Sequence, residues 1–313
     1  MYSENDKRTV LSVIVSVFNE ENVLQIFYDA VKPCLDGLGE SYELVFVNDG
    51  STDNSKEILK GFAHNDHKVR VISFSRNFGH EAAMLAGIDN SNGDFIICMD
   101  SDLQHPVDCI PEILEKLKCG NDVISMVRTK NHAAGAIKNV SSKAFYSIIN
   151  KMGNTHLEKN ASDFYGISAR VADVLRSDYR ERVRFIRGYI QNIGFKKDRI
   201  EYEAADRAGG RSKYSFGKLL RFSMDTIVCF SDAPLKFGIY AGIFAIIIGI
   251  IMTIYTIITW EREGAPNGYA TIVVLMCFMF GVLFLLVGII GMYISVIFRE
   301  MKRRPIYIIE ETV

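Results

Sequence analysis

Two aspartates one residue apart follow an apolar run that is predicted to be a buried strand. The run is Phe95–Met99, and Asp100 and Asp102 come directly after it. Open α/β folds bind ligands at the carboxyl ends of their strands, and carboxylate oxygens are hard ligands for a divalent cation. The segment therefore predicts a cation held against a diphosphate. A surface turn leading into a helix at Pro106 is the alternative, because Asp and Ser are ordinary turn residues.

Acidic residues also follow two earlier predicted strands. Glu20 comes after the first β-branched apolar run, and Asp49 comes after the second. A carboxylate at a strand end can accept hydrogen bonds from a base or a ribose. For residues 48–53, an Asx-turn and helix cap is the structural alternative. The sequence has no glycine-rich pattern of a dinucleotide redox enzyme or a P-loop NTPase, so neither class is indicated.

Positive charge is concentrated at two further places. Arg128 and Lys130 follow the fifth predicted strand, and the glycine-containing stretch 206–214 carries three more cations: Arg207, Arg211 and Lys213. Glycines let backbone N–H groups approach a phosphate closely, while Arg and Lys supply the charge. Both places are candidates for phosphate binding. A solvated loop is the alternative for each of them.

Strand-like and helix-like patterns alternate through the first two hundred residues. The predicted strands are 11–17, 43–47, 69–74, 95–99 and 122–126, with helical patterns between them. Such alternation predicts a mainly parallel sheet covered on both faces, with each acidic or basic loop at a carboxyl end. The length of 313 residues suggests roughly two domains.

Two long uncharged stretches follow this region. Residues 237–259 and 269–298 contain 23 and 30 residues without a charge. Each is longer than the about 20 residues needed to cross a hydrocarbon core, so we predict two transmembrane helices, about 237–259 and 270–297. A buried hairpin in a large soluble core is the alternative. The connection 260–268 is short and turn-forming, which indicates an antiparallel pair.

The charges that flank these stretches predict their orientation. Basic residues lie on both outer sides: Lys218, Arg221, Lys236, Arg299, Lys302, Arg303 and Arg304. By the positive-inside rule, residues 1–232 and the tail 299–313 are expected in the cytoplasm. Residues 1–10 are polar, so no cleaved signal peptide is expected. The amphipathic stretch 216–230 is expected to lie on the membrane surface.

Cysteine spacing and overall charge bound the remaining classes. The six cysteines show no metal-ligand spacing, which fits a reduced compartment and packing roles. The net charge is −1, and neither large basic blocks nor a nucleic-acid motif is found in the sequence. We therefore expect no nucleic-acid partner.

Four motifs in order resemble the family 2 GT-A glycosyltransferases. They are Val15–Glu21 (VSVFNEE), Val47–Asp53 (VNDGSTD), Ser75–Ala83 (SRNFGHEAA) and Asp100–Pro106 (DSDLQHP). The two-helix tail narrows the resemblance to the polyprenyl-phosphate glycosyltransferases, the group of bactoprenol glucosyltransferases and dolichol-phosphate mannose synthases. Ser16 and Phe18 depart from the family's usual Pro and Tyr, and the departure bears on the fine shape of the base pocket and not on the fold.

The resemblance implies a GT-A catalytic domain at 1–205 that resembles a Rossmann fold. A phosphate-binding loop and interface helix would follow at 206–235, then two transmembrane helices within 236–298 and a tail at 299–313. It also implies a cytoplasmic-membrane enzyme that inverts configuration while moving a hexose from a nucleotide sugar, UDP-glucose or a related UDP-sugar, to a polyprenyl phosphate. The acceptor would be undecaprenyl phosphate, and the resembled family forms tetramers.

The resemblance also implies roles for individual residues. Mg²⁺ or Mn²⁺ would be held by Asp100, Asp102 and Gln104. The nucleotide would be bound by Val17, Asn19, Glu20, Asp49, Asn77, Asp100 and Ser101. Phosphates would be bound by Arg128, Arg207, Arg211 and Lys213. The catalytic residues would be Asp102, Arg211 and Asp163, which lies in the acidic segment 162–166, although a cap or turn is the alternative there.

Three other functions stay open on the sequence. A GDP-mannose-dependent mannosyltransferase has the same motifs. A processive polysaccharide synthase shares the fold, but two helices are few for a channel, and the stretch 184–188 only approximates its Q-x-x-R-W motif. A non-catalytic membrane scaffold is disfavoured by the intact Asp100 and Asp102.

Overall fold

The computed structural model describes residues 9–129, 158, 160–182, 184–203, 233–263 and 268–313. These residues form two compact units. One is an α/β unit that contains the described residues up to 203 together with 304–313, and the other contains two long helices. The predicted loop cations Lys130, Arg207, Arg211 and Lys213 lie outside the described residues, as does the stretch 216–230.

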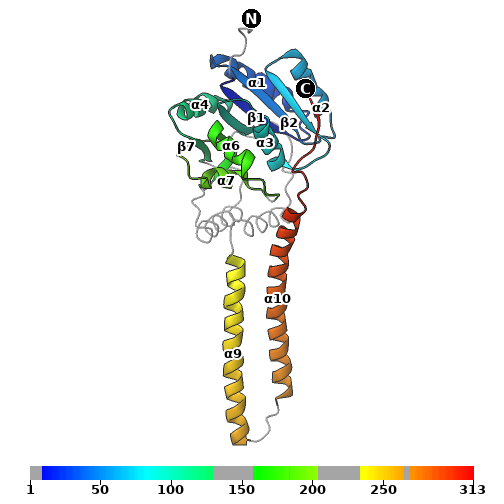
Figure 1. Ribbon diagram of the computed structural model, residues 1–313, viewed down its shortest axis with the longest axis vertical. Helices are drawn as coiled ribbons and strands as arrows, with labels where there is room; N and C mark the ends of the chain where they lie inside the picture. Colours follow the sequence, from blue (N-terminus) through cyan, green and yellow to red (C-terminus); the bar gives the residue numbers. More distant parts are fainter. Residues whose placement is uncertain (1–8, 130–157, 159, 183, 204–232, 264–267) are drawn as a thin grey trace. The chain divides into compact units, whose positions relative to one another are not determined.

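The described part of the α/β unit is built on one eight-stranded sheet with the order β7-β5-β6-β4-β1-β2-β3-β8 (Figure 1). Strands β1 to β4 run parallel to their neighbours among themselves, and β5 runs parallel to β7. Strand β6 is antiparallel between β4 and β5, and β8 is antiparallel on β3. The prediction of a mainly parallel sheet is confirmed. The strands are β1 Leu11–Val17, β2 Tyr42–Asn48, β3 Val69–Phe74, β4 Phe95–Asp100, β5 Val123–Arg128, β6 Ala161–Ser168, β7 Lys197–Tyr202 and β8 Ile309–Thr312.

Apolar side chains on both faces explain why the central strands are continuous hydrophobic runs. Every residue of β2 is buried, and so are all but one of β1. Helices cover both faces, which leaves no solvated side for polar residues. The helices are α1 Leu24–Gly37, α2 Ser55–Asn65, α3 His80–Asp89, α4 Ile110–Lys118, α6 Ala169–Ser177 and α7 Ile186–Asn192.

Helix α4 illustrates how the sequence pattern produces this packing. Its buried residues are Ile110, Ile113, Leu114 and Leu117, which recur at the spacing of one helix face. A proline in its first turn fits the start of a helix, where the missing N–H has no partner to lose. Lys116 and Lys118 in the last turn oppose the negative end of the helix dipole.

Register brings the chemically interesting strand ends together. Ser16 in β1 pairs with Val47 of β2 on one side and with Asp100 of β4 on the other. The turns that follow β1, β2 and β4 therefore leave the sheet at one edge. This edge is the one on which the sequence predicted ligand binding.

The acidic segment 162–166 is the middle of strand β6 rather than a cap or turn. Antiparallel pairing sets Cys98 of β4 opposite Tyr165. Asp100 follows Cys98 by two residues and Asp163 precedes Tyr165 by two, and His80 lies within 4 Å of both aspartates. The strand crosses close over α4, because a Cβ on Gly166 would come within 2.4 Å of the Ile113 side chain.

The C-terminal tail differs from the prediction of a separate segment at 299–313. Residues 304–313 belong to the α/β unit, and β8 adds a strand to β3. Val71 and Val313 exchange two backbone hydrogen bonds of 2.8 and 2.9 Å. The tail has no hydrophobic alternation long enough to predict a strand. Strand β8 forms because it pairs with β3, which lies more than two hundred residues earlier in the chain.

The helical unit consists of α9, Ala233–Glu263, and α10, Tyr269–Met301, which run antiparallel (Figure 1). A Cβ on Gly238 of α9 would lie 3.0 Å from the Leu286 side chain of α10, so the helices are in contact there. Large apolar side chains face outward, such as Phe284 at 72% exposure. Among the described residues, one span of 24 residues, Phe278–Met301, is long and apolar enough to cross a membrane, and α9 has a shorter apolar stretch, Gly238–Met252. The predicted two-helix hairpin is thus supported in part.

Candidate active site

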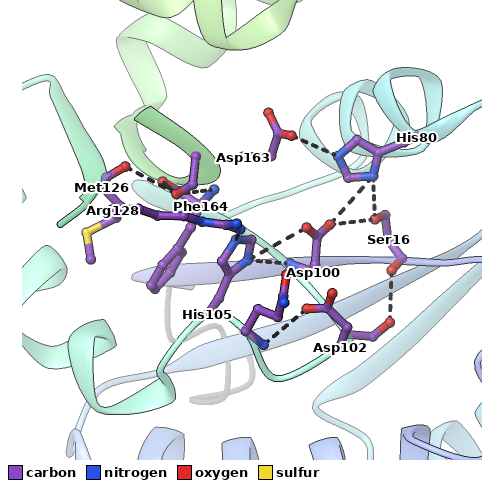
Figure 2. A network of polar contacts seen from close by, with 12 residues as sticks. Ser16, His80, Asp100, Asp102, His105, Met126, Arg128, Asp163 and Phe164 are labelled. Carbon is purple, nitrogen blue, oxygen red and sulfur yellow. Dashed lines mark hydrogen bonds and ion pairs between the residues drawn. The ribbon is translucent and has the colours of Figure 1, made fainter. Parts of the chain in front are cut away.

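Two of the three predicted metal ligands, Asp100 and Asp102, lie at a tight turn at the end of β4 (Figure 2). Asp100 is the last residue of the strand, and the backbone N–H of Gln104 donates to Asp102 Oδ1 at 3.1 Å. Leu103 between them has φ of 59°, in the left-handed region. Asn and Asp visit that region more readily than a Leu does, so the turn is held by its surroundings. All three predicted ligands are half-buried.

Negative charge is crowded around Asp100. Burial, together with the carboxylates of Asp163 and Asp102, raises the pKa of Asp100 to about 6, although His80 and Arg128 oppose the rise. A buried carboxylate with carboxylate neighbours is unfavourable in its ionised form. A bound cation would relieve that cost.

His80, the first residue of α3, lies between the two ends of the site (Figure 2). Its Nδ1 is 2.9 Å from Ser16 Oγ and 3.6 Å from Asp100 Oδ1, while its Nε2 is 3.9 Å from Asp163 Oδ2. Burial lowers the pKa of His80, but the carboxylates of Asp100, Asp163 and Glu81 outweigh it, and the net pKa is raised. His80 therefore offsets part of the negative charge of the two aspartates.

His105 holds the start of the turn by a hydrogen bond with the Asp100 backbone. It is fully buried, stacks on Phe164 with ring centroids 5.1 Å apart, and accepts at Nδ1 from the Asp100 N–H at 3.0 Å. Burial and the nearby Arg128 lower the pKa of His105 to about 3, so the ring is neutral. Arg128 Nη2 lies 3.2 Å from Nε2. A neutral imidazole accepts at only one nitrogen, so Arg128 competes with the Asp100 amide for that role.

Arg128 is anchored at a second point. Its Nε donates to the Tyr202 hydroxyl at 2.9 Å. The guanidinium thus stands at the end of β5 beside the Asp100 turn, where the sequence predicted a phosphate ligand. An arginine in that position can make paired hydrogen bonds to phosphate oxygens.

Asp163 lies between Arg187 and His80. Arg187 Nη1 of α7 lies 3.4 Å from Asp163 Oδ1, opposite His80. Burial raises the pKa of Asp163, but Arg187, His80 and other cations outweigh it, so the net pKa is lowered. Asp163 is therefore a carboxylate near neutral pH.

The turns after β1 and β2 are interlocked. Asn19 has φ of 55°, its N–H donates to Ser51 Oγ, and its side-chain oxygen accepts from the Thr52 N–H at 2.8 Å. The Glu20 N–H donates to Ser55 Oγ at 3.0 Å. These bonds fix the predicted nucleotide residues of the first motif against the second. Val17 ends β1, and its carbonyl accepts from the Asp49 N–H.

Asp49 is buried, and its carboxylate accepts hydrogen bonds from the backbone of the third motif. Its Oδ1 accepts from the Phe78 N–H at 2.6 Å, and its Oδ2 accepts from the Gly79 N–H at 2.9 Å. Burial raises the pKa of Asp49 against the lowering effect of these bonds. Asn77 of the same loop is exposed, and Ser101 is buried with its hydroxyl 3.4 Å from the Ser16 carbonyl. The predicted nucleotide residues thus all lie at strand ends or in the turns that follow them, at one edge of the sheet. They are Val17, Asn19, Glu20, Asp49, Asn77, Asp100 and Ser101.

The residues at this edge fit a divalent cation as far as their donors allow. Among the described residues, no group of three His, Cys, Asp or Glu side chains is arranged to hold a metal. Asp100 and Asp102 supply two carboxylates, and Gln104 could add an amide oxygen. Such an open set suits Mg²⁺ or Mn²⁺ shared with substrate phosphates and water, since Mg²⁺ is commonly bound by one or two carboxylates plus phosphates.

Comparison with known proteins decides the family. The model of the family described as glycosyl transferase family 2 matches residues 12–174. The chain belongs to that family. It is a glycosyltransferase, and the candidate site gathers residues from the carboxyl ends of β1 to β5, which lie inside the matched region.

Its relatives match over nearly their full lengths. An uncharacterized glycosyltransferase, YkcC, of Bacillus subtilis is 37% identical, with 96% of this chain and 93% of that protein covered. A prophage-derived bactoprenol glucosyl transferase of Shigella flexneri is 35% identical, with 96% and 98% covered. A solved structure described as a mycobacterial protein shares the fold at 16% identity and a TM-score of 0.50, covering 70% of this chain and 73% of that one.

Several residues of the glycosyltransferase site had no predicted role. His80 and His105 lie inside recognised motifs, but no spacing rule assigns them a partner. Arg187 meets the site only through folding. Glu81 follows His80 in the third motif but had no predicted role, and Ser16 was noted solely as a departure from the family pattern. Glu81 accepts from the Ile186 N–H at 2.9 Å and so ties α3 to the start of α7.

Proposed function

We propose that this glycosyltransferase moves a hexose from a nucleotide sugar, most readily UDP-glucose, to a polyprenyl phosphate with inversion of configuration. The observation that carries the proposal is the similarity to bactoprenol glucosyl transferases across 96% of this chain. That similarity extends beyond the family domain at 12–174 into the two long helices. An acceptor with a long apolar tail accounts for the helices better than a soluble acceptor would.

Donor activation is assigned to the turn after β4. Asp100 and Asp102 would hold Mg²⁺ or Mn²⁺, which supplies Lewis-acid stabilisation of the departing diphosphate. Arg128 stands beside that turn and would bind a phosphate oxygen, and the loop cations Arg207, Arg211 and Lys213 are proposed to complete the charge. Stabilising the leaving group in this way is the largest catalytic contribution expected of the site.

Acceptor activation needs little proton transfer. A phosphate monoester is already anionic near neutral pH, so the reaction depends on positioning more than on a strong base. Asp163 is ionised and is held between Arg187 and His80. We assign it the role of orienting the sugar or the acceptor across from the metal turn. Arg187 and His80 would keep it in place.

The pH dependence of metal binding tests the role of Asp100. Because its pKa is about 6 without a metal, Asp100 is mostly ionised at pH 7 and about one-tenth ionised at pH 5. A metal binds only the ionised form, so the apparent affinity for Mn²⁺ should fall about tenfold over that range. Titration calorimetry with MnCl₂ on the detergent-purified chain measures this. Asp100→Asn should bind weakly at both pH values, and an equal affinity of the wild-type protein at pH 5 and pH 7 would contradict the assignment.

The membrane arrangement follows from the two outer ends of the helical hairpin. Residues 304–313 belong to the same unit as the catalytic sheet, so the chain must return to the side on which that sheet lies. An even number of membrane crossings satisfies this requirement, and the basic flanks favour the cytoplasmic side. We therefore propose a multi-pass protein of the cytoplasmic membrane with its site in the cytoplasm.

Cysteine labelling on intact cells tests this arrangement. An impermeant maleimide should modify a cysteine placed at Asn267, in the connection between the helices, and should spare one placed at Thr312 in β8. The parent chain with its own cysteines gives the background, and permeabilised cells should label both positions. Labelling of Thr312→Cys on intact cells, with Asn267→Cys spared, would place the site away from cytoplasmic nucleotide sugars.

The donor is tested with a panel. Purified chain, undecaprenyl phosphate and Mn²⁺ are incubated with UDP-glucose, UDP-galactose, UDP-N-acetylglucosamine or GDP-mannose, and lipid-linked sugar is measured. UDP-glucose is expected to give the highest kcat/KM. A preference for GDP-mannose would change the donor while keeping the reaction class, and transfer from none of them would contradict the proposed function.

A further inference from the structure

The C-terminal segment 304–313 lies next to the part of the sheet that leads into the predicted nucleotide-binding loop 75–79. The chain leaves α10 at Met301 and enters β8 at Ile309, where it pairs with β3. Strand β3 ends at Phe74. The loop 75–79 that follows donates backbone hydrogen bonds from Phe78 and Gly79 to the Asp49 carboxylate. The tail therefore borders the strand that leads directly into a predicted nucleotide-binding loop.

Main-chain bonds continue from the strand into the loop. The register between β3 and β8 shifts after Ser73, and Phe74 pairs with Ile309. The N–H of Ser75, the first loop residue, donates to the Ile308 carbonyl at 3.1 Å. The tail thus fixes the start of the loop as well as the edge of the sheet.

Tyr307 holds the two elements on either side of this loop. Its ring stacks on Phe74 with centroids 5.2 Å apart and planes 10° from parallel. Its hydroxyl donates to Asp89 Oδ2 at 2.6 Å, and Asp89 is the last residue of α3. Burial and the Asp89 carboxylate raise the pKa of Tyr307, so the hydroxyl stays protonated and able to donate.

One more aromatic contact connects Tyr307 to Asp49. Phe74 meets Phe78 edge to face, with centroids 5.7 Å apart, and the Arg76 guanidinium lies over the Phe78 ring, 4.1 Å from its centroid. The Phe78 N–H makes the 2.6 Å bond to Asp49. Aromatic pairs prefer defined geometries, so a change at Tyr307 is passed to Phe74 and from there to the backbone of Phe78.

We infer that Tyr307 is a positioning residue for the donor site, and that it acts by fixing the loop 75–79 against Asp49. The inference rests on the proposed function, because it takes Asp49 and Asn77 as nucleotide contacts. It assigns the C-terminal segment a part in donor binding in addition to its place in the sheet. Neither the acceptor nor the helical hairpin is involved in the effect.

The test compares three single variants of the full-length chain. Tyr307→Ala removes the stacking on Phe74 and the hydrogen bond to Asp89, and Tyr307→Phe keeps the stacking. Glu310→Gln, three residues further along the tail, removes the 2.7 Å ion pair between Glu310 of β8 and Lys56 of α2. UDP binding with MnCl₂ is measured by calorimetry. We expect Tyr307→Ala to weaken UDP about tenfold, the upper end of what one aromatic pair contributes, and the other two to stay within about twofold of wild type.

A second readout separates positioning from general stability. Hydrogen–deuterium exchange without nucleotide should be faster at the Phe78 and Gly79 amides in Tyr307→Ala, and unchanged in Glu310→Gln. The KM for nucleotide sugar should rise about tenfold with the KM for undecaprenyl phosphate unchanged, since aromatic contact is lost only on the donor side. If Tyr307 had only a structural role, Tyr307→Ala would lower the melting temperature but would leave the exchange at Phe78 and Gly79 and the KM for nucleotide sugar unchanged.

The outcomes distinguish this inference from the proposed function. Unchanged exchange at Phe78 and Gly79 in Tyr307→Ala, or unchanged UDP affinity despite faster exchange, would overturn the positioning role. A wild-type chain that binds UDP but transfers no sugar to undecaprenyl phosphate would overturn the proposed function. The exchange and calorimetry comparisons would still decide the role of Tyr307.

Discussion

Replacing Asp102 with Asn is expected to lower sugar transfer at least about a hundredfold, while the protein stays folded. The substitution keeps the side-chain volume and removes one ligand charge from the proposed metal at the point where the diphosphate leaves. Losing one such electrostatic contact to a transition state typically costs about 10²–10³ in rate. Steady-state transfer of labelled glucose at saturating Mn²⁺ measures the effect.

A matched control lies a few residues away. Asp108, in the turn just before α4, is exposed, and Asp108→Asn makes the same chemical change outside the site. It should transfer within about twofold of wild type, as surface substitutions usually change little. A rate for Asp102→Asn above a tenth of wild type would remove Asp102 from the metal site.

The second large effect is expected from Arg211→Ala. Arg211 lies outside the described residues, so the prediction rests on its loop sequence, in which glycines at 209 and 210 are interleaved with three cations. A lost charge-assisted hydrogen bond to a phosphate costs roughly 1.5–3 kcal/mol, or about 10- to 150-fold in rate. Membrane insertion should be unchanged, because the proposed membrane helices α9 and α10 would supply it.

Kinetics with both substrates varied measures this effect. Arg199→Ala is the control, since Arg199 on β7 is 57% exposed and its guanidinium lies 3.7 Å from each of the carboxylates of Glu158 and Glu201. It should leave kcat and both KM values within about twofold of wild type. Unchanged kcat and KM in Arg211→Ala would mean that the loop is a solvated linker.

Local patterns in the sequence predicted the strands that run through the core. Residues 11–17 and 69–74 are strands with the predicted bounds, and the other three predicted strands differ by two residues or fewer at each end. These strands are buried on both faces, so their apolar runs are long and unbroken. The acidic turns at their carboxyl ends followed from the same alternation, because parallel strands bring those ends to one edge.

Strands defined by distant partners were not predicted. Strand β6 reads as polar and aromatic residues with a glycine, and it is fixed by pairing with β4 and β5 on both sides. Strand β8 pairs with residues some 240 positions earlier. No window of sequence contains such partners, so local propensity could not indicate either strand.

The site shows the same division. Asp100, Asp102, Asp49 and Glu20 stand out because acids at strand ends are unusual after apolar runs. Arg187 comes from α7, whose position depends on tertiary packing, and it reaches Asp163 only after folding. Glu81 lies in the third motif, but the motif does not indicate its hydrogen bond with the Ile186 N–H, which forms only in the folded chain. The loop 206–214 was assigned from composition and resemblance, and its geometry stays a prediction.

The product of the reaction is the most direct test of the proposed transfer of glucose to a polyprenyl phosphate with inversion of configuration. Purified chain is incubated with UDP-glucose, Mn²⁺ and undecaprenyl phosphate, and the lipid product is analysed by mass spectrometry and by NMR of its anomeric proton. We expect one glucose on the lipid phosphate in the β-configuration, because an inverting transfer reverses the α-linkage of the donor. A product with the α-configuration, a polymer of glucose, or free glucose alone would contradict it.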